Sequence, residues 1–158
     1  MKKIWLLTFM MLLSIIPVLY SSGPFEDNFN GTIGDKGTSL EWLKCSAPQT
    51  YSGGNCTGTV QAYTWESALA YCENLTLGGG GWRLPSINEL VSIMDNSRNP
   101  AIHSFFSTPI TNDSEYWSST TYVKGISESW SVSFYNAGFT TTRIKNEAYP
   151  YVRCVRGP

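Results

Sequence analysis

Four cysteines follow an apolar leader, and this combination limits the fold more than any other feature of the sequence. The leader has a basic start, Lys2-Lys3, then an almost wholly apolar run over residues 4–20, and ends in small residues. This order is typical of a secretory signal peptide. The alternative is a retained membrane anchor, because the run nearly reaches the roughly 20 residues that span a bilayer. We predict a signal peptide or N-terminal anchor over 1–23 and an extracytoplasmic domain over 24–158.

In an exported chain, an even number of cysteines favours two disulfides. Cys45 and Cys56 flank a short turn-prone segment, so a local bridge between them is the simplest pairing. Cys72 lies on the apolar face of a predicted helix, which favours a bridge to another core position, Cys154, over the other pairings. Free buried thiols are the alternative. Because no Cys-x-x-Cys pair exists and His103 is the only histidine, we expect no metal site and no cofactor.

Two amphipathic helices are predicted in the middle of the chain. Thr64 caps the first, whose buried stripe is Trp65, Ala68, Leu69, Cys72 and Leu75. Ser86 and Glu89 form a capping box that opens the second, with Ile87, Leu90, Val91 and Met94 on its apolar face. Short strands are predicted at 40–43, 116–122, 129–134, 139–144 and 149–155. The order predicts an α+β domain with two helices packed on short antiparallel strands.

The length and charge of the mature chain exclude some classes of protein. Residues 24–158 suffice for one domain with a core, and not for two. Once Lys2 and Lys3 are removed with the leader, 9 basic residues remain against 12 acidic ones, a net charge of −3. A general polyanion binder is normally basic. We therefore expect no nucleic-acid partner, and no membrane contact except through an uncleaved leader.

The run of glycines at 78–81 suggests a phosphate-binding loop, but its context is wrong. A Walker loop needs a lysine and a hydroxyl residue after the last glycine, and here Trp82-Arg83 follows. A dinucleotide fingerprint needs a preceding strand, and here a helix precedes. We expect these glycines to end one helix in left-handed backbone and to allow a tight reversal. We expect Arg83 to pair with a carboxylate such as Glu89, or to cap loop carbonyls, rather than to bind an anionic ligand.

Neither the acidic residues nor the tryptophans indicate a catalytic site. Asp113 and Glu115 lie in one loop and Asp95 ends the second helix, but nothing fixes an acid–base pair at a useful separation. We expect solvated loop acids, with a weak calcium site as the minor alternative. The periodic positions of Trp65, Trp82, Trp117 and Trp130 predict that all four are in the core.

A binding face is predicted on the late sheet. Exposed tyrosine beside Asn, Thr and Arg is how adaptable binding surfaces are commonly made, although a solvated edge strand fits the same pattern. The residues that we expect to contact a ligand are Tyr135, Asn136, Thr140, Thr142, Arg143, Lys145 and Tyr149, with Lys124 nearby.

Six segments occur here in an order that resembles a known family. They are FEDNFNGTIGD, SLEWLKC, TWESALAYCENL, GGWRLPSINELVSI, YWSSTTY and YVRCVRG. From about Phe25 to Gly157 the chain resembles the C-terminal domain of the Legionella collagen-like adhesin, a widespread bacterial family. That family is similar to the C-type-lectin-like fold group, which includes the formylglycine-generating enzymes and the variable receptors made by diversity-generating retroelements. The lectin-like fold joins its first helix to its last strand by a disulfide, and Cys72 and Cys154 occupy the matching positions.

The departures from that group narrow what the resemblance implies. The calcium-dependent sugar motifs, Glu-Pro-Asn or Gln-Pro-Asp followed by Trp-Asn-Asp, are absent. The late reactive cysteine pair of the formylglycine-generating enzymes is also absent, because Cys154 is the only late cysteine. The adhesin domain is associated with sulfated glycosaminoglycans, which bind to basic protein surfaces. The net charge of −3 argues against this ligand unless Lys124, Arg143, Lys145 and Arg156 cluster.

We therefore predict a secreted or cell-surface bacterial binding module with a lectin-like fold and no catalytic activity. Its partner would be a glycan, with sulfated glycans among the candidates, or a surface protein. One alternative is a structural domain that forms a homo-oligomer in a surface assembly. The weaker alternative is an enzyme of the formylglycine-generating type.

Overall fold

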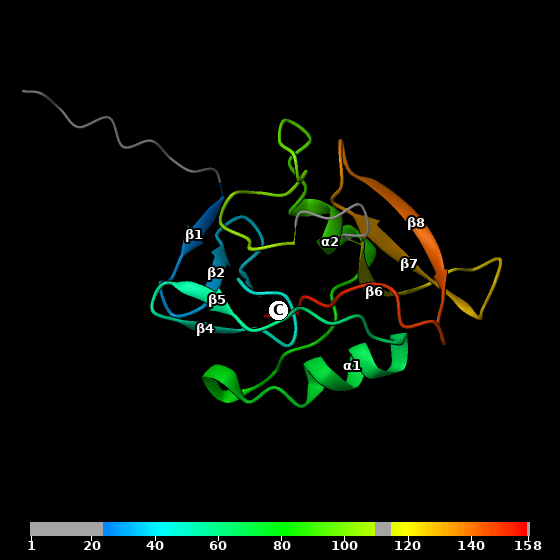
Figure 1. The fold of residues 1–158 in the computed structure, drawn as a ribbon, viewed down its shortest axis with the longest axis horizontal. Helices are drawn as coiled ribbons and strands as arrows, with labels where there is room; N and C mark the ends of the chain where they lie inside the picture. The colour runs from blue at the N-terminus through cyan, green and yellow to red at the C-terminus, as the bar shows by residue number, and fades with distance from the viewer. Residues whose placement is uncertain (1–23, 110–114, 158) are drawn as a thin grey trace, which may run out of the picture.

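The computed structural model describes residues 24–109 and 115–157 (Figure 1). The helices are α1 (Trp65–Glu73) and α2 (Ile87–Ser92), with a 3-10 turn η1 (Leu77–Gly79) between them. The strands are β1 (Phe25–Asp27), β2 (Thr32–Asp35), β3 (Leu40–Leu43), β4 (Thr50–Ser52), β5 (Asn55–Thr57), β6 (Glu115–Thr121), β7 (Glu128–Ser133), β8 (Phe139–Ile144) and β9 (Val155–Arg156). The predicted leader lies outside the described residues. None of the helices in the described ranges is long and apolar enough to cross a membrane.

The strands form three antiparallel sheets, as the α+β prediction requires. The first has the order β1-β2-β3-β9, so the two ends of the domain are paired, with Trp42 opposite Val155. The second is the β4–β5 hairpin, and the third has the order β6-β7-β8. Figure 1 shows the third sheet on one side of the molecule, β1, β2 and the hairpin on the other, and α1 along one edge. The predicted α+β class, with two helices and antiparallel strands, is confirmed.

Strands β6 and β7 of the third sheet are covered on both faces, so the core includes more of these strands than their apolar residues indicate. Tyr116 and Trp117 are neighbours on β6 and point to opposite faces, Tyr116 into a core with α2 and Trp117 into a core with α1. Three serines of β7, which alternate with its apolar residues, are therefore also buried: Ser129, Ser131 and Ser133. Their burial is tolerated because each hydroxyl forms a hydrogen bond, as a donor in Ser129 and Ser131 and as an acceptor from the Tyr135 backbone N–H in Ser133. Ser129, for example, reaches the carbonyls of Ser118 and Thr120 at 3.0 and 2.8 Å.

Two tryptophans predicted to be in the core are only half-buried. Trp130 is the third residue of β7 and packs edge-on against Tyr122, with ring centroids 5.3 Å apart. Trp65 is the first residue of α1, and its indole nitrogen donates to the carbonyl of Ser118 on β6 at 2.8 Å. Trp82 and Trp117 are buried as predicted. A periodic position therefore identifies the face of an element, but not how far the core extends along it.

Both predicted disulfides are present. Cys45–Cys56 closes the loop that carries β4 and β5, and Cys72–Cys154 joins α1 to the segment before β9. The predicted strand at 149–155 is mostly irregular, because its carbonyls bond to several elements in turn. Those of Pro150, Val152 and Cys154 accept from Tyr63, Ala47 and Leu43. This segment therefore ties the first sheet to α1 rather than extending one ladder.

Both helices begin where predicted. The Thr64 hydroxyl accepts from the backbone N–H of Ser67 at 3.3 Å, and Ser86 and Glu89 form the reciprocal capping box. The second helix is shorter than predicted and ends at Ser92. Its buried positions are Leu90 and the cap residue Ile93, while Val91, predicted to be apolar-facing, is 38% exposed. Because the chain leaves helical geometry at Ile93, the buried face of the second helix is smaller than predicted.

Candidate binding site

The glycine-rich loop is a structural element that is held by an arginine. Gly78, Gly79, Gly80 and Gly81 all have positive φ, as expected for a left-handed reversal. Arg156 donates to the carbonyls of Leu77, Gly78 and Gly80 at 3.1, 2.7 and 3.2 Å. The carbonyls of this loop therefore bind the guanidinium of Arg156, so the loop has a structural role.

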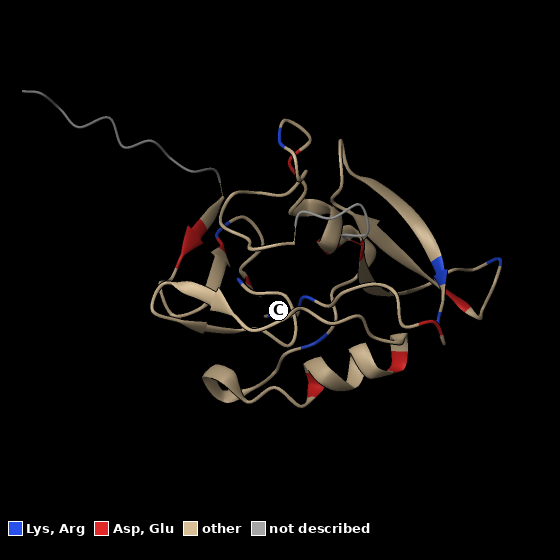
Figure 2. Ribbon diagram, viewed as in Figure 1, with Lys and Arg blue, Asp and Glu red and all other residues tan. Residues whose placement is uncertain are grey.

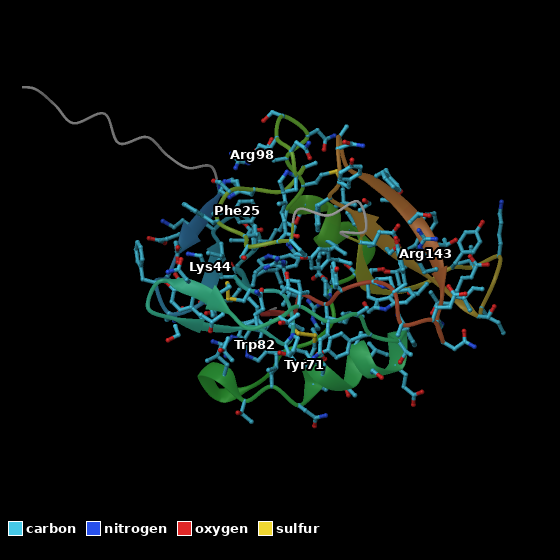
Figure 3. All side chains as sticks on the ribbon, in the orientation of Figure 1. Phe25, Lys44, Tyr71, Trp82, Arg98 and Arg143 are labelled. Carbon is cyan, nitrogen blue, oxygen red and sulfur yellow. A yellow bond between two sulfur atoms is a disulfide. The ribbon has the colours of Figure 1, made fainter. Side chains whose placement is uncertain are left out.

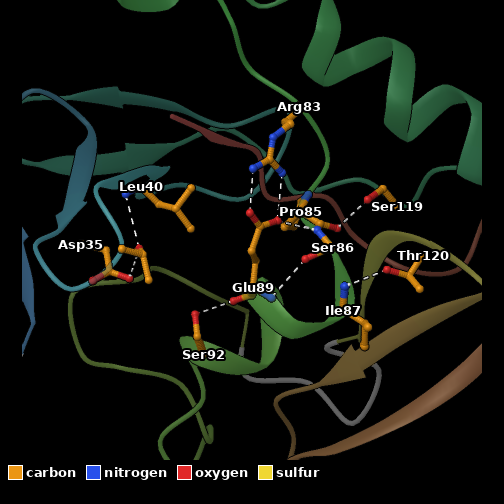
Figure 4. Close-up of polar contacts among 11 residues, drawn as sticks. Asp35, Leu40, Arg83, Pro85, Ser86, Ile87, Glu89, Ser92, Ser119 and Thr120 are labelled. Atoms are coloured by element: carbon orange, nitrogen blue, oxygen red, sulfur yellow. Dashed lines mark hydrogen bonds and ion pairs between the residues drawn. The ribbon is translucent and has the colours of Figure 1, made fainter. Parts of the chain in front are cut away.

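Arg83 pairs with Glu89, as predicted (Figure 4). Its two terminal nitrogens donate to the two carboxylate oxygens at 2.9 and 2.6 Å. The bond from Arg83 lowers the pKa of Glu89 from 4.5 to about 2, against the opposing effect of burial, and the Ser86 backbone and hydroxyl assist. Figure 4 also shows Thr120 of β6 accepting from the backbone of Ile87. The Arg83–Glu89 ion pair connects the first turn of α2 to the segment that precedes it.

The predicted binding residues of β8 fall on two faces of the sheet. Thr140 and Thr142 lie opposite Val132 and Trp130 and so share the α2 side. Arg143 alternates with them and lies on the α1 side. The Thr142 hydroxyl donates to Glu128 at 2.5 Å. The strand therefore does not present all of these side chains to one ligand.

Arg143 is anchored by a buried carboxylate that the sequence analysis assigned to a solvated loop. Glu115 is only 4% exposed and accepts from Nε and a terminal nitrogen of Arg143 at 2.8 and 2.5 Å, and from Ser131 at 3.2 Å. That assignment was wrong because Glu115 starts β6, where it lies across from buried Ser133. On its other side, the Arg143 guanidinium lies 4.8 Å from the ring centroid of Tyr149. Asp113 lies outside the described residues.

Lys145 repeats this arrangement two residues further along. Its ammonium lies 4.1 Å from the ring centroid of Trp65 and donates to Thr121 and to the carbonyl of Ile126 at 2.8 and 3.0 Å. In the part of the chain that the structure describes, no carboxylate lies within ion-pair distance of this ammonium. Arg143–Tyr149 and Lys145–Trp65 thus form two neighbouring cation–aromatic pairs on the α1 side, which we call the paired-cation face.

The other predicted residues lie away from the paired-cation face. Tyr135 and Asn136 are in the turn before β8, at the opposite end of that strand from Arg143, and Asn136 has a φ of 54°. Lys124 is exposed in the loop between β6 and β7. Arg156 holds the glycine loop and does not join the other cations. Figure 2 shows Lys and Arg interspersed with Asp and Glu over the fold, rather than gathered in one basic surface.

Trp65 was missed as a surface residue because its helical position fits the core stripe. Its position as the first residue of the helix, directly after a capping threonine, could have indicated partial exposure. The end of a helix commonly extends beyond the sheet on which the helix packs. Among the residues that the structure describes, no three His, Cys, Asp or Glu side chains gather where they could hold a metal ion.

The fold defines an α+β module with two disulfides, a bond type that is typical of extracytoplasmic proteins. The family model described as the Lcl C-terminal domain matches residues 31–156, which is most of the chain. The chain therefore belongs to the Lcl C-terminal domain family, as its motifs predicted. No curated protein matches the chain. No solved structure matches it either, so the lectin-like assignment stays a prediction.

Proposed function

We propose that this protein is a non-catalytic binding module that acts outside the cytoplasm and recognises a glycan or protein ligand through the paired-cation face. The observation that carries the proposal is the side-by-side placement of Arg143 on Tyr149 and Lys145 on Trp65. Each pair offers hydrogen-bond donors beside a flat apolar ring. Partly exposed cation–aromatic pairs contribute about 0.5–1 kcal/mol each within the protein, so they hold the surface in shape before a ligand arrives.

The chemistry of the face suits a ligand that carries acceptor groups next to apolar patches. Arg143 is paired with Glu115, and Glu147 lies near enough to interact with its charge, whereas Lys145 forms no ion pair with any described residue. The face thus carries one cation without an ion-pair partner among the described residues, which favours single acceptor or anionic groups over a densely charged polymer. The disulfide between Cys72 and Cys154 supports a binding role over formylglycine-type chemistry, since both sulfurs are bonded.

A binding screen with three variants tests this proposal. The purified protein is screened on a glycan array and on extracellular matrix proteins, at two salt concentrations and with a chelator. Tyr149→Ala and Lys145→Gln are expected to weaken any interaction found at least tenfold. Lys36→Gln is the matched control, because Lys36 is 67% exposed and pairs only with Glu26 on another sheet. Arg143 is unsuitable as the first test, because its loss strands the buried Glu115. Unchanged binding by both test variants would overturn the proposed face.

Self-association is a second candidate function, favoured by one observation. β8 is an edge strand of its sheet, and Phe139 and Ile144 on it are 51% and 44% exposed. Exposed edge strands with apolar side chains pair readily with other chains. Light scattering of the purified protein, with Phe139→Lys as the test variant, shows whether the protein self-associates through β8. A defined oligomer that Phe139→Lys dissociates would favour an assembly role, and a monomer would exclude it.

A further inference from the structure

A cleft of about 230 Å³ lies between the β4–β5 hairpin and the C-terminal half of α1. We call it the tyrosine cleft, because Tyr51 of β4 and Tyr71 of α1 both line it. Leu43, Leu75 and Leu77 add apolar walls. Its volume is below the roughly 300–1,000 Å³ of pockets that hold drug-sized ligands, so it has room for one small ring. In Figure 3, Tyr71 is on α1, whereas Arg143 of the paired-cation face is on β8.

The lining of the tyrosine cleft carries no charged side chain among the described residues. The cation beside it, Lys44, lies 5.3 Å from the ring centroid of Tyr51 and is already paired with Asp27. A sulfate or carboxylate that entered would give up its water without gaining a counterion, which costs several kcal/mol. The cleft therefore favours a neutral ligand.

Two amides in the lining have one unused polar atom each. Asn30 accepts at Oδ1 from the backbone N–H and hydroxyl of Thr32, at 3.0 and 2.7 Å, while its Nδ2 donates to no described residue. Gln49 donates from Nε2 to the carbonyl of Gly58 at 3.0 Å, while its buried Oε1 has no donor within the described part of the chain. A ligand hydroxyl can accept from the Asn30 amide, and where the Gln49 side chain turns its enclosed oxygen toward the cleft a second hydroxyl can donate to it. A hydrocarbon side chain can do neither, and would leave the Gln49 oxygen unsatisfied.

The walls of the cleft are fixed before any ligand binds. Cys45 belongs to the lining, and its bridge to Cys56 holds the hairpin in place. Gly31 packs so tightly under Tyr51 that an added Cβ would lie 2.6 Å from the Tyr51 Cβ. The α1 wall is held by the Cys72–Cys154 bridge. Such a site loses little conformational entropy when a ligand enters.

We propose that the tyrosine cleft binds a single neutral sugar ring, with its C–H face against the tyrosines and leucines and its hydroxyls on the amides of Asn30 and Gln49. This site is separate from the paired-cation face, and the inference does not depend on that proposal. A neutral ring of this kind could be a terminal residue of a glycan or a free monosaccharide. Binding of both the free sugar and its methyl glycoside identifies a terminal residue, and binding of the free sugar alone identifies the monosaccharide.

The test is titration of the ¹⁵N-labelled protein with neutral hexoses and N-acetylhexosamines up to about 50 mM, since one ring gives affinities near the millimolar range. Glucuronate, a sulfated glucosamine, phenol and leucinamide are the comparison ligands. We expect shifts at the Asn30 side-chain amide and around Tyr51 and Tyr71 with at least one neutral sugar. Binding of phenol or leucinamide without any neutral sugar would overturn the proposal in favour of an apolar side chain of a partner. Equal binding of the charged sugars would also overturn it.

Asn30→Asp is the matched variant for locating the site. It keeps the oxygen that caps Thr32 but replaces the unused donor with a negative charge, so we expect at least a tenfold loss of sugar affinity. Asn55→Asp makes the same charge change at the exposed tip of the hairpin, where Asn55 does not line the cleft, and is expected to bind normally. Tyr149→Ala should also leave this binding unchanged. Retained affinity in Asn30→Asp, or equal loss in Asn55→Asp, would contradict the assignment.

Discussion

Arg156 lies directly against Gly78: a Cβ on Gly78 would be 2.6 Å from a terminal nitrogen of the Arg156 guanidinium. Arg156 cannot easily move aside, because it also bonds to Glu41 at 2.7 Å and lies 4.7 Å from the Trp82 ring centroid. The contact connects the glycine loop after α1 to β9 and, through Glu41, to β3. The glycine loop, whose sequence suggested a phosphate site, thus helps to hold the C-terminal strand β9 against β3 near the start of the domain.

This contact predicts different costs for two neighbouring substitutions. Gly78→Ala combines left-handed strain at φ +59° with the clash, and we expect it to lower the free energy of unfolding by about 2–3 kcal/mol. Gly79→Ala places no atom within 4 Å of its added Cβ, so only backbone strain applies, and at φ +94°, beyond the left-handed region that L residues reach, we expect it to cost about 1–2 kcal/mol. Urea denaturation of both variants measures the difference. Equal destabilisation would mean that Arg156 gives way freely.

The Arg83–Glu89 pair predicts how stability changes in acid. Because the folded state holds the pKa of Glu89 at about 2, below its unfolded value of 4.5, the contribution is fully present above about pH 4.5. It is lost as pH falls from there through about 2. We expect Glu89→Gln to cost about 1–2 kcal/mol at pH 7, a figure reduced for partial exposure, and the gap from wild type to close near pH 2. Denaturation at a series of pH values measures it, and a gap independent of pH would contradict the assignment.

Arg153 predicts a large loss of stability from a single core substitution. It is fully buried, no carboxylate of the described residues pairs with it, and burial lowers the pKa of its guanidinium. It donates instead to the carbonyls of Leu43, Lys44 and Ser107 and to the Ser46 hydroxyl. Arg153→Met would remove these bonds from buried acceptors, although the Lys44 carbonyl still accepts from the Ser107 N–H and the Ser107 carbonyl from the Ser46 hydroxyl, so we expect a loss of about 2–4 kcal/mol. Arg98→Met, at an exposed position, should change thermal stability little. A mild effect of Arg153→Met would show that water replaces the guanidinium.

The comparison between sequence and structure separates local from non-local information. Thr64, Ser86 and Glu89 act within a few residues of themselves, so their caps could be predicted from spacing alone. The burial of Ser131 could not, because it depends on α1 and α2 covering opposite faces of one sheet. The candidate site divides in the same way. Arg143, Lys145 and Tyr149 were predicted, but their grouping with Trp65, and the anchoring of Arg143 by Glu115, need the tertiary fold.

The two disulfides are predicted to differ in how much of the fold depends on them. Cys72–Cys154 spans 82 residues and Cys45–Cys56 only 11, and chain-entropy arguments give about 4–5 and about 3 kcal/mol respectively. Burial increases the difference in stability that we expect between the two disulfide variants, because Cys72 and Cys154 are both fully buried, while Cys56 is partly exposed.

We therefore expect the double alanine variant at Cys72 and Cys154 to unfold, or nearly so, at 37 °C. The variant at Cys45 and Cys56 should keep the core but loosen the hairpin that forms one wall of the tyrosine cleft. Urea denaturation and near-ultraviolet circular dichroism check the first expectation, and the sugar titration described above checks the second. Equal losses of stability would show that the loop closed by Cys45–Cys56 is integral to the core. A folded variant at Cys45 and Cys56 with undiminished sugar binding would place the ligand elsewhere, because the cleft could not keep its shape without the bridge that forms part of its lining.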